Sequence, residues 1–98
     1  MFMTVLEAHI ESAQWATLSE GFEKAQAQRP PQIVESMLAQ SQEDPTLWRS
    51  IAIWPSKEAF DAFRQLGITS PAILVFRAAG GEPTLGTFQL TAFHLQGQ

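Results

Sequence analysis

The chain has 98 residues, 45% of them hydrophobic and 16% charged, and a net charge of -4 with only six Lys and Arg residues. A chain of this length buries one core, so a single domain over residues 1–98 is expected, and so few cations argue against a nucleic-acid or anionic-membrane partner. No cysteine, basic leader or long apolar run is present, which predicts a cytoplasmic protein without disulfides.

The N-terminal part predicts a strand, a helix and a second strand. Phe2 to Glu11 alternates between two faces. One face carries Phe2, Thr4, Leu6, Ala8 and Ile10, and the other carries Met3, Val5, Glu7 and His9. Ser12 is placed to cap a helix that the prolines at positions 30 and 31 end. Gln32 to Gln42 then returns to the composition of a strand.

The clearest local signal is a junction between a strand and a capped helix. The turn residues 43–46 join the preceding strand directly to Leu47–Trp54, which predicts an antiparallel hairpin. Pro55 cannot continue a sheet ladder and therefore stops the strand. Ser56 is placed as the N-cap of a helix that Gly67 ends.

Residues 70–81 carry two conflicting signals. Ser70 as N-cap, Pro71 at the first helical position and the glycines at 80 and 81 favour a short helix. The apolar run 73–76 is equally compatible with a buried strand, because periodicity cannot decide over so short a segment. We favour the helix.

The last predicted strand runs from Thr84 to Leu95, with Gly86 as a candidate bulge and residues 96–98 as a frayed tail. The order strand, helix, strand, strand, helix, short helix, strand indicates an α+β, ferredoxin-like split βαβ fold with a four-stranded antiparallel sheet. Helices on one face leave the other face apolar and open. Such a face predicts a homodimer that buries sheet against sheet.

Three segments resemble the antibiotic biosynthesis monooxygenase family of the dimeric α+β barrel superfamily. They are residues 5–10 (VLEAHI), residues 53–60 (IWPSKEAF) and residues 81–83 (GEP). The resemblance covers nearly the whole chain. It implies two four-stranded sheets that close into a shared barrel, with helices outside and a pocket between each sheet and its helices.

The family holds several activities. Members that degrade haem use an asparagine, a tryptophan and a histidine at positions that match Ala8, Phe63 and about Ile73, so haem degradation is not expected. Cofactor-free members oxidise polycyclic phenols through a substrate anion, held by Trp, Tyr, Asn or Arg side chains. The chain has no tyrosine, but Trp54 matches the junction tryptophan and Arg77 can reach the pocket from the third helix.

The resemblance therefore implies cofactor-independent oxygenation of a small aromatic or polyketide-like compound, with Trp54 orienting the substrate and Arg77 polarising it. The pocket would be lined by Leu6, Ala8, Trp54, Phe60, Phe63, Ile73 and Phe76. A tryptophan at a strand end under a helix is usually a core residue, and ordinary core packing is also the usual explanation for Phe60 and Phe63. The alternative is a non-catalytic homodimeric module that binds a small apolar or aromatic ligand or serves in protein interaction.

The remaining polar candidates carry weaker signals. Glu7 and His9 share one strand face, so they form either a base or switch or a hydrogen-bonded interface pair. His94 lies toward the other end of the sheet, and two separated histidines predict no metal site. Arg49 and Arg77 lie nearest apolar segments, where either could anchor an acidic ligand or remain solvated.

Overall fold

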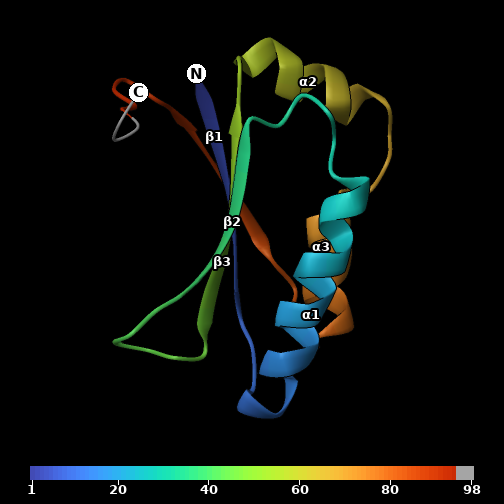
Figure 1. Ribbon diagram of the computed structural model, residues 1–98, viewed down its shortest axis with the longest axis vertical. Coiled ribbons are helices and arrows are strands. Elements are labelled where there is room, and N and C mark those ends of the chain that lie inside the picture. Colours follow the sequence, from blue (N-terminus) through green and yellow to red (C-terminus); the bar gives the residue numbers. More distant parts are fainter. Residues whose placement is uncertain (95–98) are drawn as a thin grey trace.

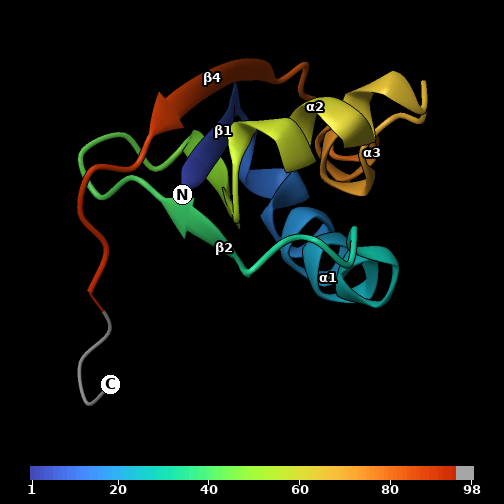
Figure 2. The ribbon, with the colours of Figure 1, turned by 90° about the horizontal axis from the view of Figure 1, so that it is seen from above.

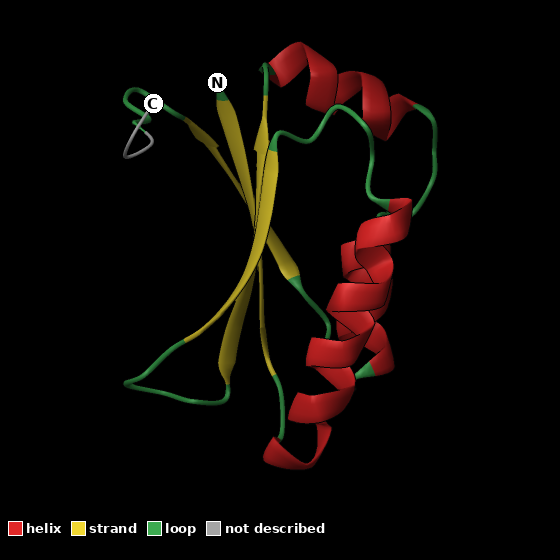
Figure 3. Cartoon of the chain, in the orientation of Figure 1, coloured by secondary structure: helices red, strands yellow, loops and turns green. Residues whose placement is uncertain are grey.

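The structure is a computed structural model that describes residues 1–94, and its elements follow the predicted order (Figure 3). The strands are β1 (Phe2–His9), β2 (Glu35–Gln40), β3 (Leu47–Trp54) and β4 (Thr84–Gln89). The helices are α1 (Trp15–Ala25), α2 (Lys57–Gln65) and α3 (Pro71–Ala78), with short 3-10 turns at Ser12–Gln14 and Gln26–Gln28. No helix within residues 1–94 is long and apolar enough to cross a bilayer.

The four strands form one antiparallel sheet in the order β2-β3-β1-β4. All three α-helices lie on the same side of this sheet, as the side view and the view from above both show (Figures 1 and 2). The predicted α+β, ferredoxin-like fold with its four-stranded antiparallel sheet is therefore confirmed.

The predicted alternation along β1 is also confirmed. Phe2, Thr4, Leu6 and Ala8 are buried on the side of the helices, whereas the residues between them are only partly covered. This face of the sheet, which we call the covered face, continues on β3 because Leu6 pairs with Ser50 and Phe2 pairs with Trp54. Position in the two-residue repeat thus decides which side chains meet the helices.

The junction after β3 has the geometry that its residues predict. The Ser56 hydroxyl accepts a hydrogen bond from the Ala59 N–H at 3.1 Å and so caps α2. At the other end Gly67 adopts φ 71°, and its N–H donates to the Arg64 carbonyl at 3.1 Å. Helix α2 is therefore held at both termini by local hydrogen bonds.

The segment with conflicting signals is a helix. Ser70 accepts from the Ala72 N–H at 3.3 Å, Pro71 opens α3, and Gly80 at φ 86° follows its end. The apolar run that also fits a strand places Phe76 in the core, with 1% of the residue exposed. The caps decide the outcome, as they specify helix ends independently of the apolar pattern between them.

Several predicted boundaries are wrong. The last strand ends at Gln89, because Gln89 pairs with Phe2, the first residue of β1, and no partner strand extends further within the described residues. The predicted end at Leu95 and the frayed tail at 96–98 lie outside the described residues. Gly86 is not a bulge, since the register with β1 passes through it without interruption.

The other boundary errors concern the first helix and the two strands around it. Ser12 is not an N-cap; it lies inside a 3-10 turn, and the helix proper starts at Trp15. Strand β1 ends at His9, although the Ile10 N–H still donates to the Thr46 carbonyl at 2.7 Å in continuation of the register with β3. Strand β2 starts at Glu35 rather than at position 32.

The core on the covered face has two parts. The larger part, the α1–α3 cluster, consists of Leu6, Ala8, Ile10, Leu18, Trp48, Phe76 and Ala79. The smaller part, the α2 cluster, consists of Phe2, Trp54 and Phe60. Helix α2 lies at one end of the sheet, and α1 and α3 lie side by side along the rest (Figure 1).

The opposite face of the sheet carries apolar side chains without a covering helix. It includes Met3, Val5, Met37, Ile51 and Phe88, and Phe88 is 50% exposed. Glu7 and Arg49 form an ion pair across this open face at 2.6 Å. The open face is thus mainly apolar, and its charged groups include the Glu7–Arg49 ion pair and the exposed Glu35 of β2.

Candidate functional site

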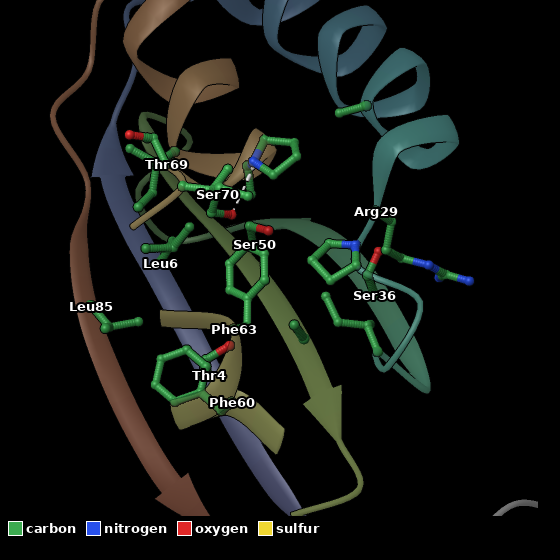
Figure 4. Close-up of a pocket in the computed structure, with 18 of the residues that line it drawn as sticks. Thr4, Leu6, Arg29, Ser36, Ser50, Phe60, Phe63, Thr69, Ser70 and Leu85 are labelled. Carbon is green, nitrogen blue, oxygen red and sulfur yellow. Dashed lines mark hydrogen bonds between the residues drawn. The ribbon is translucent and has the colours of Figure 1, made fainter. Parts of the chain in front are cut away.

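A cavity of about 340 Å³ lies between the covered face of the sheet and the three helices (Figure 4). Its apolar wall includes Leu6, Phe22, Ile33, Phe60, Phe63 and Ile73. Small-molecule sites in proteins typically have volumes of roughly 300–1,000 Å³ and are mostly apolar with a few placed polar groups. The cavity has room for a small organic molecule.

Two buried hydroxyl groups lie on the floor of this cavity. Thr4 of β1 and Ser50 of β3 are both on the covered face, and each residue is only 6% exposed. They interrupt the apolar alternation at positions where the sheet meets the helices. A hydroxyl at such a position needs a hydrogen-bond partner, which a bound ligand or a neighbouring side chain can supply.

Trp54 forms a rigid part of the wall, with its polar group already engaged. Its indole Nε1–H donates to Thr4 Oγ1 at 3.1 Å. Its ring centroid lies 5.2 Å from that of Phe60 and 5.7 Å from that of Phe63. Trp54 therefore presents an aromatic surface to the cavity, while the Thr4 hydroxyl keeps its own proton available for donation to a ligand.

The structure brings together most of the residues that the sequence predicts for the pocket. Leu6, Trp54, Phe60, Phe63 and Ile73 line the cavity. Ala8 and Phe76 do not line it; both belong to the α1–α3 cluster, which is filled. Ala8 lies on the covered face but too far along the sheet, and Phe76 of α3 packs over that same part of it.

Arg77 reaches the rim of the cavity from α3, but its guanidinium is held by another side chain. Its Nη2 donates to Glu82 Oε1 at 2.9 Å and its Nε donates to Oε2 at 3.0 Å. These hydrogen bonds raise the pKa of Arg77 and lower the pKa of Glu82. For Arg77 to polarise a ligand, this exposed ion pair must open.

No family model matches the sequence, and no curated protein matches it. Solved structures do match. A candidate antibiotic biosynthesis monooxygenase from Deinococcus radiodurans superposes with a TM-score of 0.71 at 14% identity, covering 99% of this chain and 100% of that one. One from Bordetella bronchiseptica gives 0.73 at 17% identity, covering 93% and 97%.

A third match is SnoaB, a cofactor-independent oxygenase from Streptomyces nogalater, with a TM-score of 0.70 at 22% identity over 94% of each chain. The fold is that of antibiotic biosynthesis monooxygenases. At these identities the likeness concerns the path of the backbone and not the residues of the site.

Within this monooxygenase fold, sequence reasoning missed the floor and the mouth of the cavity. Thr4 and Ser50 could have been found, because they are polar residues at core positions of the two-residue repeat. Arg29 and Arg64 at the mouth gave no such signal. They lie where α1 ends and where α2 ends, and only the packing of these two helix ends over the sheet brings both to one cavity.

The polar candidates outside the cavity lie elsewhere in the monooxygenase fold. Glu7 and His9 do not pair: Glu7 binds Arg49 on the open face, and His9 Nδ1 lies 3.0 Å from Thr46 Oγ1. Thr46 also donates a hydrogen bond to Asp44, and this bond lowers the pKa of the Asp44 carboxyl. Residues 1–94 contain no group of three or more His, Asp or Glu side chains arranged to hold a metal ion.

Proposed function

We propose that the protein is a cofactor-independent monooxygenase acting on a small aromatic or polyketide-like compound bound in this cavity. The observation that carries the proposal is the aromatic cavity with two hydroxyls on its floor, in a fold shared with a cofactor-independent oxygenase. The cavity supplies apolar surface for a ring system, and the hydroxyls supply hydrogen bonds for a ring oxygen.

The proposed reaction uses molecular oxygen as the oxidant and the substrate as the only reductant. A methylene group of the substrate ring loses both of its hydrogen atoms and becomes a carbonyl group. One atom of the oxygen molecule enters this carbonyl, and the other leaves as water with the two hydrogens. The substrate first loses a proton to solvent water, because no carboxylate, histidine or lysine of residues 1–94 lines the cavity, and the resulting carbanion or phenolate reduces oxygen. The four electrons that oxygen accepts all come from the substrate.

Each side chain of the site has a role in this proposal. The Trp54 ring, fixed by Phe60 and Phe63, orients the substrate plane. The Thr4 hydroxyl, which accepts from Trp54, donates to the substrate oxygen and stabilises its anionic form. Arg77 polarises the substrate from the rim once Glu82 releases it.

The proposal includes a homodimer that buries the open face of the sheet. The exposed side chains of Met37 and Phe88, together with Val5 and Ile51, form an apolar surface that favours contact with a second copy. A two-fold arrangement satisfies both copies at once. Native mass spectrometry tests this: a dimer is expected, and a monomer at micromolar concentration would contradict it.

A second candidate function is binding without catalysis. The observation that favours it is the chemistry of the cavity wall, whose only titratable side chains within the described residues are the arginines at positions 29, 64 and 77. No carboxylate, histidine or lysine in this part of the chain lines the cavity to accept the substrate proton. A ligand-binding module needs no such group.

Oxygen consumption with candidate phenols and anthrone-type compounds separates the two functions. Under the monooxygenase proposal, Thr4→Val lowers kcat by about tenfold, because it removes the hydrogen bond to the substrate anion in the transition state. Trp54→Phe lowers kcat by a similar factor, because it removes the hydrogen bond that positions the Thr4 hydroxyl. The control is Trp48→Phe, which removes an indole N–H that has no partner among residues 1–94 and does not line the cavity. Tight binding of the same compounds without oxygen uptake would instead support the binding module.

A further inference from the structure

The charges around the cavity run against the charge of the whole chain. The protein carries a net charge of -4, yet three of its six Lys and Arg residues, Arg29, Arg64 and Arg77, line the cavity. No Asp or Glu side chain lines it within the described residues. The mouth of the cavity is therefore a local positive region on an acidic protein.

The three arginines differ in how much of their charge is free. Arg77 is neutralised by its bidentate pair with Glu82. Neither Arg29 nor Arg64 has a salt-bridge partner within residues 1–94. Two uncompensated positive charges thus remain at the mouth, and both can attract an anion.

Arg64 and Arg29 come from different elements, Arg64 from α2 and Arg29 from the end of the 3-10 turn that follows α1. The Arg64 guanidinium carbon lies 5.6 Å from the centroid of the Phe60 ring, so its stem follows the aromatic wall. The guanidinium of Arg29 extends outward from the group of lining side chains (Figure 4). Arg64 can therefore touch the part of a ligand that lies at the mouth, and Arg29 acts mainly by attraction from farther out.

We propose that the cavity takes its ligand as an organic anion, a small aromatic acid whose ring lies against the aromatic wall that Trp54 and Phe63 form while its charged group stays near Arg64 and Arg29. This inference rests on the proposed function, in which the cavity binds an aromatic compound. The ionised group is the acid at the mouth, and it is distinct from the ring position that loses a proton in the proposed oxidation.

The energetics favour this division between ring and charge. An apolar wall stabilises the buried ring by removing it from water, whereas a fully buried carboxylate without a partner is strongly disfavoured. Charges at a rim exposed to solvent add modestly to affinity and mostly raise the association rate. Their effect falls with added salt, as exposed charges are screened over about 10 Å at 0.1 M ionic strength and about 3 Å at 1 M.

The test is isothermal titration calorimetry with naphthoate and with its neutral methyl ester, which share the same ring. Naphthoate is expected to bind about threefold to tenfold more tightly at low ionic strength, from two exposed charge contacts. This preference should shrink toward unity at about 1 M salt, where the screening length is short. Equal affinity for the acid and the ester at low salt would overturn the inference.

Substitutions at the arginines, with a lysine substitution as the control, show which side chains cause the preference for naphthoate. Arg64→Gln should remove most of the preference for naphthoate over the ester, and Arg64→Lys should restore that preference. Lys24→Gln is the control, since it makes the same change in net charge on an exposed side chain that does not line the cavity. If the preference survives in an Arg29→Gln, Arg64→Gln double variant, the arginines do not select the ligand.

The outcomes also separate this inference from the proposed function. Ester and acid that bind equally well leave the cavity as an aromatic site and overturn only the anion selectivity. If neither compound binds to the wild-type protein, the cavity is not an aromatic ligand site, and both proposals fail. Binding of naphthoate that Trp54→Ala leaves unchanged would place the ligand outside the cavity, which also contradicts both.

Discussion

Trp48 and Trp54 lie near opposite ends of β3 on the same face of the sheet, and their surroundings differ. Trp48 packs against Trp15 in the filled α1–α3 cluster, and its indole N–H has no partner among the described residues. Trp54 lines the cavity and donates its N–H to Thr4. The same residue type serves as packing at one end of the strand and as part of a candidate site at the other.

The helices explain this difference. Helices α1 and α3 pack side by side so closely that a Cβ added at Gly21 would lie 3.3 Å from a Val75 methyl group. Helix α2 stands apart from them at the end of the sheet (Figure 1). The space between α2, the end of α1 and the start of α3 is the cavity. A cavity in this fold thus follows from helix placement more than from the residues on the strands.

The largest expected effect is a difference in stability between two phenylalanine variants. One phenylalanine lies in the filled α1–α3 cluster and the other lies beside the cavity. Phe76→Ala should lower the free energy of unfolding by about 3–5 kcal/mol, because Phe76 is fully enclosed in the α1–α3 cluster. Phe63→Ala should lower it by about 1–2 kcal/mol, since Phe63 already borders open space and its removal enlarges an existing cavity. Urea denaturation of both variants measures the contrast. Equal losses would show that the cavity end is filled core.

A smaller effect is expected from adding a methyl group at Gly81, beside the filled α1–α3 cluster. A Cβ at Gly81 would lie 2.5 Å from Cδ1 of Ile10 and 3.3 Å from the Cβ of Ala8. Ile10 is 1% exposed and cannot move aside, so Gly81→Ala should destabilise the protein by about 1–3 kcal/mol. Urea denaturation measures the loss. A Gly81→Ala variant as stable as the wild type would contradict close packing at this end.

The hydrogen bond at the cavity end gives a third, still smaller effect. Thr4→Val keeps the shape of the side chain but removes the acceptor for the Trp54 N–H, and it should lower stability by about 1 kcal/mol. The effect is at the low end of the range for such losses, because water in the cavity can replace the acceptor. Thr87→Val, a change at an exposed residue paired with Thr4, provides the comparison by thermal denaturation.

The sequence predicts the covered face well and the cavity only in part. Two-residue alternation assigns Leu6, Ala8 and Trp54 to the covered face, and the cap at Ser56 fixes where α2 begins. Alternation says which face a residue occupies but not whether a helix covers it at that position along the strand. Ala8 therefore fits the pattern expected of a pocket residue although it lies under the filled end.

The charged rim could not be predicted for a related reason. Arg29 follows α1 and Arg64 ends α2, so their positions depend on how the two helices end over the sheet. The ion pair between Arg77 and Glu82 depends on the turn through Gly80 at φ 86°, which returns the chain toward β4. Local sequence patterns fix each helix end but not the distance between two of them.

The smallest expected effect concerns Arg77, which follows Phe76 of the filled end and also lines the cavity. The Arg77 hydrogen bonds lower the pKa of Glu82, so the pair contributes stability above the ordinary glutamate pKa of about 4.3 and loses it as the pH falls through the lowered pKa. Glu82→Gln should therefore be slightly less stable than the wild type at pH 7 and equal to it in strong acid. Thermal denaturation across this range tests the sign.

The same variant also tests whether Arg77 can act at the cavity. With Glu82 replaced by a neutral side chain, the Arg77 guanidinium loses its bidentate partner and becomes a third free cation at the rim. At pH 7 the Glu82→Gln variant should then bind naphthoate more tightly than the wild type while ester binding stays constant. A variant that loses the pH-dependent stability but gains no affinity would show that Arg77 belongs to the filled end and plays no part in the site.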